Sequence, residues 1–365
     1  MWGEMLALKV VQITNTPCIC VYPCSVELHV LVWPSVCWSL CLAMLNHECF
    51  VEIYFSRNLT RHHRLEEKNG GHATTTMKIT AVTTHDVRFP TSADLSGSDA
   101  VHKDPDYSCV YVVVSTDDPS CPEGYGLTFT LGRGNEIVAS CVKALSFLLV
   151  GKDFDQDIVK DMMNVDDHKG FYYQICQEGQ LRWLGPEKGV VALAAGAIMN
   201  AVWDIMARRA GKPLWEFVCD MEPEELIQYI DFKHIDDFVT KEEALKLLRS
   251  IRPGWQERKQ QMKDQGFRAY TTSCGWLGYS LDVVRAKCRE SLAEGHQYFK
   301  MKVGSRDIQD DMKRAAVIRE EIGDDLFLMM DANQKWYVGY YCASSTVCFV
   351  SGLLVPSAYF IFALL

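Results

Sequence analysis

The sequence predicts an α/β protein in which a small α+β domain precedes the first units of a parallel (β/α)8 barrel. Three observations lead to this prediction. Short segments of alternating β-branched and polar residues come first, within residues 77–132, and helical patterns follow them. From residue 266, strand-like segments recur about every thirty residues, the length of one βα unit. No charged residue follows Lys335, so this alternation is not continued.

The first domain is expected to contain an antiparallel meander followed by helices. Its strands are predicted at residues 77–89, 109–116 and 124–132. Its main helices are predicted at residues 136–149, 190–208 and 241–249. The second helix is rich in alanine and glycine, which allows close packing, and Gly211 and Pro213 follow its predicted end.

The barrel-like region is expected to contain three strands and two helices. The strands are predicted at residues 268–274, 298–303 and 326–332, and the helices at residues 281–293 and 307–322. A complete (β/α)8 barrel needs eight such units and on the order of 250 residues. The region from residue 268 onwards is too short for that, so we expect an incomplete barrel.

Four segments follow from these patterns. Residues 1–76 are expected to be a separate, poorly ordered segment, residues 77–265 the α+β domain, residues 266–336 the partial barrel, and residues 337–365 an apolar tail. The first segment has neither the order of a signal peptide nor the arginines of a transit peptide. Pro356 interrupts the tail, so a membrane association is the less favoured interpretation.

Composition excludes some function classes. A net charge of −10 argues against a nucleic-acid partner, because phosphate binding requires a clustered basic face. The fifteen cysteines have no zinc-site spacing, and those of the central region are typical of reduced, buried thiols. A metal cluster or a disulfide framework in the cysteine-rich first fifty residues is the alternative.

Candidate catalytic residues lie at the ends of two successive predicted barrel strands. Lys300 and Lys302 alternate along one strand, so both side chains are expected on one face. Asp331 ends the next strand and Asn333 follows two residues later. In a βα barrel, the carboxyl ends of the strands form the active site. The alternatives are a solvated strand edge for the lysine pair and a turn or helix cap for the Asp-Ala-Asn segment.

These residue types suit proton abstraction next to a carboxylate. Two neighbouring ammonium groups repel each other, which lowers the pKa of at least one of them. Such a lysine can act as a general base on a weakly acidic C–H bond. A carboxylate on the neighbouring strand can bind Mg²⁺, which stabilises the dianion formed when the proton leaves.

Long motifs between about residues 77 and 336 carry a resemblance to a known family. They are DVRFPTS (86–92), DPDYS (104–108), GLTFTLGRG (126–134), GQLRWLGPEKGVV (179–191), NAVWD (200–204), YTTSCGWLGYS (270–280), FKMKVG (299–304) and LMMDANQKW (328–336). The region resembles the mandelate-racemase group of the enolase superfamily, and most closely the L-fuconate dehydratases. The α+β domain would then be the capping domain of an enolase-like fold.

The resemblance implies a role for each candidate. Lys302 would exchange the α-proton, Lys300 would contact the substrate carboxylate, Asp331 would bind Mg²⁺, and Asn333 would touch substrate. The capping domain would contribute specificity residues at Gly97, Ser98, Asp99 and Tyr107. The implied reaction removes water from a small acid sugar to give a 2-keto-3-deoxy acid. A mitochondrial or cytoplasmic location and a homo-oligomer are further expectations.

The sequence departs from the family pattern at about Tyr337. In the family, two more metal-binding acids and an Asp–His pair follow, and none of them maps onto this sequence. An alternative is therefore that the chain is a catalytically inactive truncated isoform or a mis-predicted product. It would then act at most as a folded fragment or an interaction partner.

Overall fold

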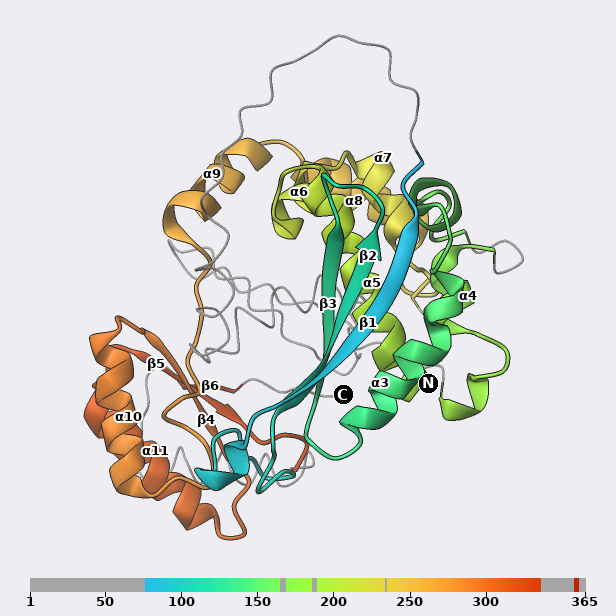
Figure 1. Ribbon diagram of the computed structural model, residues 1–365. Coiled ribbons are helices and arrows are strands. Elements are labelled where there is room, and N and C mark those ends of the chain that lie inside the picture. The colour runs from blue at the N-terminus through green and yellow to red at the C-terminus, as the bar shows by residue number, and fades with distance from the viewer. Residues whose placement is uncertain (1–75, 165–168, 186–188, 234, 336–357, 361–365) are drawn as a thin grey trace, which may run out of the picture.

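The computed structural model describes residues 76–164, 169–185, 189–233 and 235–335, and the backbone of residues 358–360. The expectations for residues 1–75 and for most of the tail lie outside this range. Within it, the elements form two groups (Figure 1). One contains an antiparallel sheet with its helices, and the other contains a parallel sheet with two helices.

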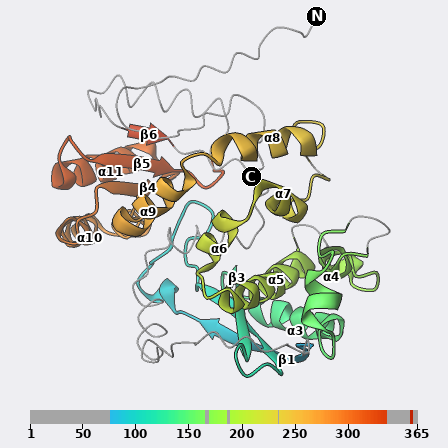
Figure 2. The same ribbon diagram turned by 90° about the horizontal axis from the view of Figure 1, so that it is seen from above.

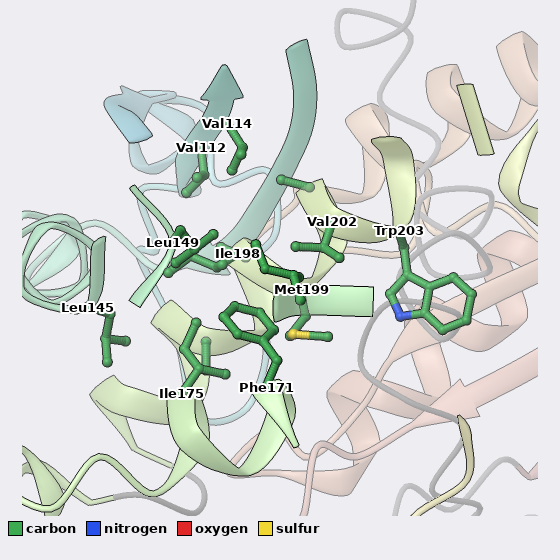
Figure 3. Packing of buried hydrophobic residues seen from close by; sticks show 14 of the residues in the cluster. Val112, Val114, Leu145, Leu149, Phe171, Ile175, Ile198, Met199, Val202 and Trp203 are labelled. Atoms are coloured by element: carbon green, nitrogen blue, oxygen red, sulfur yellow. The ribbon is translucent and has the colours of Figure 1, made fainter. Parts of the chain in front are cut away.

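The first sheet confirms the predicted meander. Strands β1 (Ile79–Arg88), β2 (Ser108–Thr116) and β3 (Glu123–Thr130) pair antiparallel in that order. Helices α3 (Asn135–Leu145) and α5 (Val190–Arg209) pack against this sheet. Figure 3 shows part of the resulting core, in which apolar side chains of α5 lie between valines of β2 and the apolar side chains of helix α4 (Phe171–Cys176). Alternation along β2 thus supplies the buried face that the helices cover.

Helix α5 lies very close to β3 because glycines line the contact. A Cβ on Gly126 would stand 2.0 Å from the carbonyl oxygen of Ala197, a distance that no side chain tolerates. The predicted close packing of this helix is therefore confirmed. Its length and hydropathy would also suit a membrane span, but 61% of that apolar stretch is buried inside the protein. Helix α5 is the central core helix of this domain.

Shorter helices connect the two groups. They are α6 (Leu214–Asp220), α7 (Pro223–Leu226), α8 (Lys241–Ile251) and α9 (Trp255–Gln265). Single turns occur at Thr91–Ala93, Ser146–Leu148, Arg182–Leu184 and Ile227–Tyr229, and a π-helical turn at Phe154–Val159. Thr240 and Glu243 form a reciprocal capping box that starts α8. The chain then passes through α9 to the second group (Figure 2).

The second sheet begins with two parallel strands joined by a helix. They are β4 (Tyr298–Lys302) and β5 (Phe327–Asp331), with α11 (Ile308–Ile322) between them and α10 (Leu281–Ala293) before β4. Phe299, Met301 and Leu328 form its core with residues of both helices. Ser280 and Asp307 cap the two helices, as polar residues do at helix starts. This order is that of βα units.

The strand predicted at residues 268–274 is wrong. Only Thr271 pairs there, in an isolated parallel bridge to Phe299. The hydroxyl of Thr271 accepts a hydrogen bond from the N–H of Ser273, and the N–H of Gly275 donates to the carbonyl of Thr272. Side-chain hydroxyls thus compete with the ladder, and the backbone turns immediately after one paired residue.

A short strand from the tail was also not expected. Residues Ala358–Phe360 form β6, which pairs parallel with Leu328–Met330 of β5. The order of this sheet is therefore β4-β5-β6. The apolar composition of this segment, Ala-Tyr-Phe, is compatible with a strand in a parallel sheet.

Candidate active site

The two lysines of β4 point toward the end of β5. Lys302 Nζ lies 2.8 Å from Asp331 Oδ2, and Lys300 Nζ lies 3.3 Å from the same oxygen. Phe299 and Met301 point the other way into the core. The expected period-2 sorting is thus confirmed. Lys302 is only 7% exposed, so a solvated strand edge is wrong for this residue.

The Asp-Ala-Asn segment forms a turn and also a contact with Lys302. The N–H of Lys335 donates to the carbonyl of Ala332, which closes the turn, and Asn333 has a positive φ of 46°. Asn333 N–H donates to Asp331 Oδ1 at 3.0 Å, and Lys302 Nζ donates to Asn333 Oδ1 at 2.8 Å. Asparagine tolerates this left-handed conformation better than most residues. The turn therefore directs the amide toward the ammonium group.

Burial and charge act in opposite directions on this cluster. Burial lowers the pKa of Lys302, the ammonium of Lys300 lowers it further, and Asp331 and Asp99 oppose both effects. Burial raises the pKa of Asp331, but the hydrogen bond from Lys302 and the charges of both lysines outweigh it, so this pKa is lowered overall. The result is a buried carboxylate shared by two ammonium groups.

Two aromatic residues complete the surroundings, and the site prediction did not include them. Tyr270 accepts a hydrogen bond from Lys300 Nζ at 2.9 Å. The indole ring of Trp276 has its centroid 5.7 Å from Lys302 Nζ, within cation–π range. Both residues belong to the motif YTTSCGWLGYS (270–280), which carried the resemblance. Tyr270 directly precedes Thr271, and Trp276 follows it five residues later. That proximity to a strand end was the available signal.

The four capping-domain candidates lie beside the loop that carries Trp276. The carbonyl and hydroxyl oxygens of Ser98 accept the N–H groups of Leu277 and Gly278 at 3.1 and 2.9 Å. Tyr107 makes an edge contact with the Trp276 ring, with centroids 6.3 Å apart. The structure therefore brings these residues to the lysine cluster across the boundary between the two groups.

Gly97 and Asp99 hold the shape of the same capping-domain loop. Gly97 has a φ of 81°, and a Cβ there would meet the Tyr107 ring at 2.4 Å. Asp99 is 7% exposed, and its Oδ1 accepts the N–H groups of Val101 and His102. A contact between these residues and a substrate stays a prediction.

A surface hollow lies away from the lysine cluster. It has a volume of about 620 Å³ and lies between α7 and the α8–α9 connection, beside Trp255. Its two arginines are already paired, Arg249 with Glu224 and Arg252 with Glu222. The convergent buried charges are at Lys302 and Asp331, so we place the candidate active site there.

The described residues supply one acidic ligand for a divalent cation at this site, Asp331. Among them, no group of three or more His, Cys, Asp or Glu side chains is placed to hold a metal ion. Both oxygens of Asp331 already accept hydrogen bonds from protein groups. The described part of the chain therefore does not by itself form a Mg²⁺ site, which requires several oxygen ligands.

Comparisons with known proteins agree with this fold. Residues 283–343 match the family model "Enolase C-terminal domain-like". The human mitochondrial enolase superfamily member 1 is 50% identical over 261 residues, covering 72% of this chain and 57% of that protein. Its crystal structure superposes with a TM-score of 0.69 at 48% identity, over 74% of this chain and 60% of that one. The antiparallel domain and the βα units thus define an enolase-like α/β protein.

The chain belongs to the enolase superfamily. It is also similar to the L-galactonate dehydratase of Hypocrea jecorina, 44% identical over 263 residues that cover 71% of this chain and 56% of that enzyme. The L-talarate/galactarate dehydratase of Salmonella typhimurium, solved with Mg, shares the fold at a TM-score of 0.52 and 21% identity. The chain spans somewhat more than half the length of the curated relatives it matches.

Proposed function

We propose that this chain carries the proton-abstraction residues of an acid-sugar dehydratase, a hydro-lyase. One observation supports the proposal above the others. Lys302 is buried at the carboxyl end of β4, and its Nζ lies 2.8 Å from Asp331 at the end of the next parallel strand. A buried lysine beside a second ammonium and a carboxylate is suited to accept a proton from a weakly acidic C–H bond.

In this proposal each residue has one task. Lys302 in its neutral form takes the α-proton of the acid sugar, and the electron pair of that C–H bond moves toward the substrate carboxylate. Lys300 binds that carboxylate, and Asn333 holds the Lys302 ammonium in place through the hydrogen bond of 2.8 Å. The electron pair then expels the β-hydroxyl, which leaves as water with one proton, equivalent in number to the one that Lys302 accepted, and the remaining enol tautomerises to the 2-keto-3-deoxy acid.

We propose Mg²⁺ as the cofactor, with Asp331 as one ligand. Two solved structures that share this fold contain magnesium, and one of them is a dehydratase. When bound, the ion supplies positive charge beside the substrate carboxylate. Because the described residues provide a single carboxylate, no step above is assigned to the ion.

L-Fuconate is the substrate that we propose, with Ser98, Asp99, Tyr107 and Gly97 shaping its pocket. A relative is named for L-galactonate, which differs from L-fuconate only by a hydroxyl group at the sixth carbon.

We propose in addition that the partial barrel consists of residues 266–336. We propose a mitochondrial location, because relatives are named as mitochondrial proteins, with a cytoplasmic location as the alternative. We also propose a homo-oligomer, on the basis of the family resemblance.

A second candidate is a chain that folds but does not turn over. The observation that favours it is that the described residues include no group of three or more His, Cys, Asp or Glu side chains placed to hold a metal ion. Such a chain would keep the capping domain and the lysine cluster and would act as a folded fragment or an interaction partner.

A deuterium-exchange assay separates these candidates. The full chain is incubated in D₂O with Mg²⁺ and either L-fuconate or L-galactonate, and ¹H NMR follows the α-proton while a colorimetric assay detects 2-keto-3-deoxy acid. We expect exchange that Lys302→Met abolishes. Lys313→Met, at a surface lysine that is 68% exposed, is the matched control and should leave exchange intact. Absence of both exchange and product with L-fuconate and with L-galactonate would favour the second candidate.

A further inference from the structure

A buried arginine of α11 lies directly behind the lysine cluster. Arg314 is 6% exposed and belongs to the helix that joins β4 to β5. Its Nη1 donates to the carbonyl of Lys302 at 2.9 Å, and its Nη2 donates to the carbonyls of Gly275 and Trp276 at 3.0 and 2.8 Å. One guanidinium therefore joins the end of β4 to the loop that carries Trp276.

These three carbonyls belong to the segments that surround the Lys302 ammonium group. The backbone N–H of Lys302 also donates to the carbonyl of Gly275, so a direct hydrogen bond joins the strand to the loop. A Cβ on Gly275 would stand 2.2 Å from the carbonyl of Lys300, so the loop and strand are in contact. Trp276 covers Lys302 from this loop, with its ring centroid 5.7 Å from Nζ. A shift of the loop would therefore move the indole relative to the ammonium.

Asp311 extends the same arrangement to the residues after β4. Its carboxylate accepts the N–H groups of Gly304 and Ser305 at 2.8 and 3.0 Å, and it lies 3.7 Å from Arg314 Nη1. Asp311 is 5% exposed. Two charged side chains one turn apart on α11 thus fix the Lys302 carbonyl and the backbone of Gly304 and Ser305 after it.

We propose that Arg314 is a positioning residue for the reaction at Lys302. The planar fork of a guanidinium can bind several carbonyls in fixed directions, whereas an ammonium is a single point charge without that geometry. Arg314 holds β4 and the 275–276 loop at the spacing that sets Lys302 between Asp331, Asn333 and Trp276. It acts through the backbone and does not itself contact substrate. This inference rests on the proposed function for its catalytic part.

The chain offers a matched control on the same helix. Arg319 is 8% exposed, and its Nη1 donates to two backbone carbonyls, those of Gly323 and Leu326. These carbonyls precede β5 at its amino end, and among the described residues Arg319 makes these contacts and none with Lys302 or Trp276. Replacing Arg319 thus removes a buried guanidinium of the same kind from the same helix while leaving the surroundings of Lys302 in place.

The first experiment does not depend on activity. Hydrogen–deuterium exchange of the full chain is measured for Arg314→Met, Arg314→Lys and the same changes at Arg319. Loss of hydrogen bonds from a charged group should raise exchange of the Lys302 amide about tenfold or more in Arg314→Met. Arg319→Met should raise exchange in residues 323–327 and leave that of Lys302 unchanged. Equal exchange of the Lys302 amide in Arg314→Met and Arg319→Met would overturn the proposal. If Arg314→Met does not fold, the same comparison is made between Arg314→Lys and Arg319→Lys.

The second experiment separates positioning from stability. In the α-proton exchange assay, Arg314→Lys should lower kcat at least tenfold and leave KM within twofold, because the base is displaced while substrate contacts persist. Arg319→Lys should change neither. An increase in KM with kcat unchanged would contradict positioning. If the unmodified chain shows no α-proton exchange, the proposed function fails, and amide exchange alone decides whether Arg314 fixes the Lys302 backbone.

Discussion

Lys302 and Asp331 are register partners at the carboxyl ends of two neighbouring parallel strands, and their side chains are joined by a hydrogen bond of 2.8 Å. Parallel pairing in this register places residue 302 directly opposite residue 331. Strand geometry then turns both side chains to the same face. This pair is the centre of the candidate site, and the first prediction concerns it.

Asp331→Asn is expected to destabilise the second group strongly. Lys302 and Lys300 would lose the carboxylate that neutralises them, and breaking a buried ion pair from one side costs about 3–5 kcal/mol. Urea unfolding followed by far-UV circular dichroism measures the change. Asp310→Asn is the control, because its carboxylate is 60% exposed and lies on the surface of α11. An equal, small effect of both substitutions would show that Lys302 and Asp331 are not a buried pair.

Gly275→Ala tests the close approach of the loop to β4. The new methyl group would stand 2.2 Å from the Lys300 carbonyl and 2.5 Å from Met301 Cα, so the backbone must move. Overpacking of this kind costs about 1–3 kcal/mol, which urea unfolding would measure. Gly179→Ala is the control, since a Cβ there has no heavy atom within 4 Å. Unchanged stability in Gly275→Ala would mean that the loop lies farther from the strand.

Ser98→Ala tests the contact between the capping domain and the second group. The substitution removes the acceptor of the Gly278 N–H, and the loss of such a part-buried hydrogen bond costs about 0.5–1.5 kcal/mol. Limited proteolysis should cut within residues 275–280 faster than in the unmodified chain. Ser140→Ala, at an exposed serine that bonds only the Glu136 carbonyl within its own helix, should leave the rate unchanged. Similar cleavage rates for the two variants would argue against this contact.

Glu321 makes stability depend on pH in the acid range. Hydrogen bonds from Arg289 and then Arg285 lower the pKa of Glu321, and these contacts join α10 to α11. A carboxylate with a depressed pKa stabilises the fold above its unfolded value of about 4.3, and this contribution is lost as the pH falls through the folded pKa. The Glu321→Gln variant should therefore have a lower free energy of unfolding than the unmodified chain at pH 7. Its free energy of unfolding should also fall less than that of the unmodified chain when the pH is lowered.

The control for that prediction is Glu320→Gln. Glu320 pairs with Arg285 alone and its side chain is 61% exposed, so its replacement should have little effect at either pH. Unfolding free energies at pH 7 and pH 3 measure both variants. A parallel loss of stability in Glu321→Gln and the unmodified chain on acidification would show that Glu321 is not responsible.

Much of the fold could be predicted from local patterns. The valine-rich run of β2, the alanine-rich α5 and the repeating βα order are visible along the chain because each reflects burial against a neighbour. The strand at 268–274 failed because the hydroxyl group of Thr271 offered the backbone N–H of Ser273 another partner. The strand at Ala358–Phe360 was missed because a short apolar run has no period of its own.

For the candidate site, the sequence by itself determined the residue types and their spacing: two lysines at alternate positions, and an aspartate and an asparagine at the end of the next strand. Tertiary structure alone decided that Lys302 is buried, that Asp331 lies between both ammonium groups, and that Arg314 holds the carbonyl groups behind them. The reason is physical. Spacing along a strand fixes the face of a side chain, whereas burial and charge pairing depend on segments far apart in sequence, which meet only when the chain is folded.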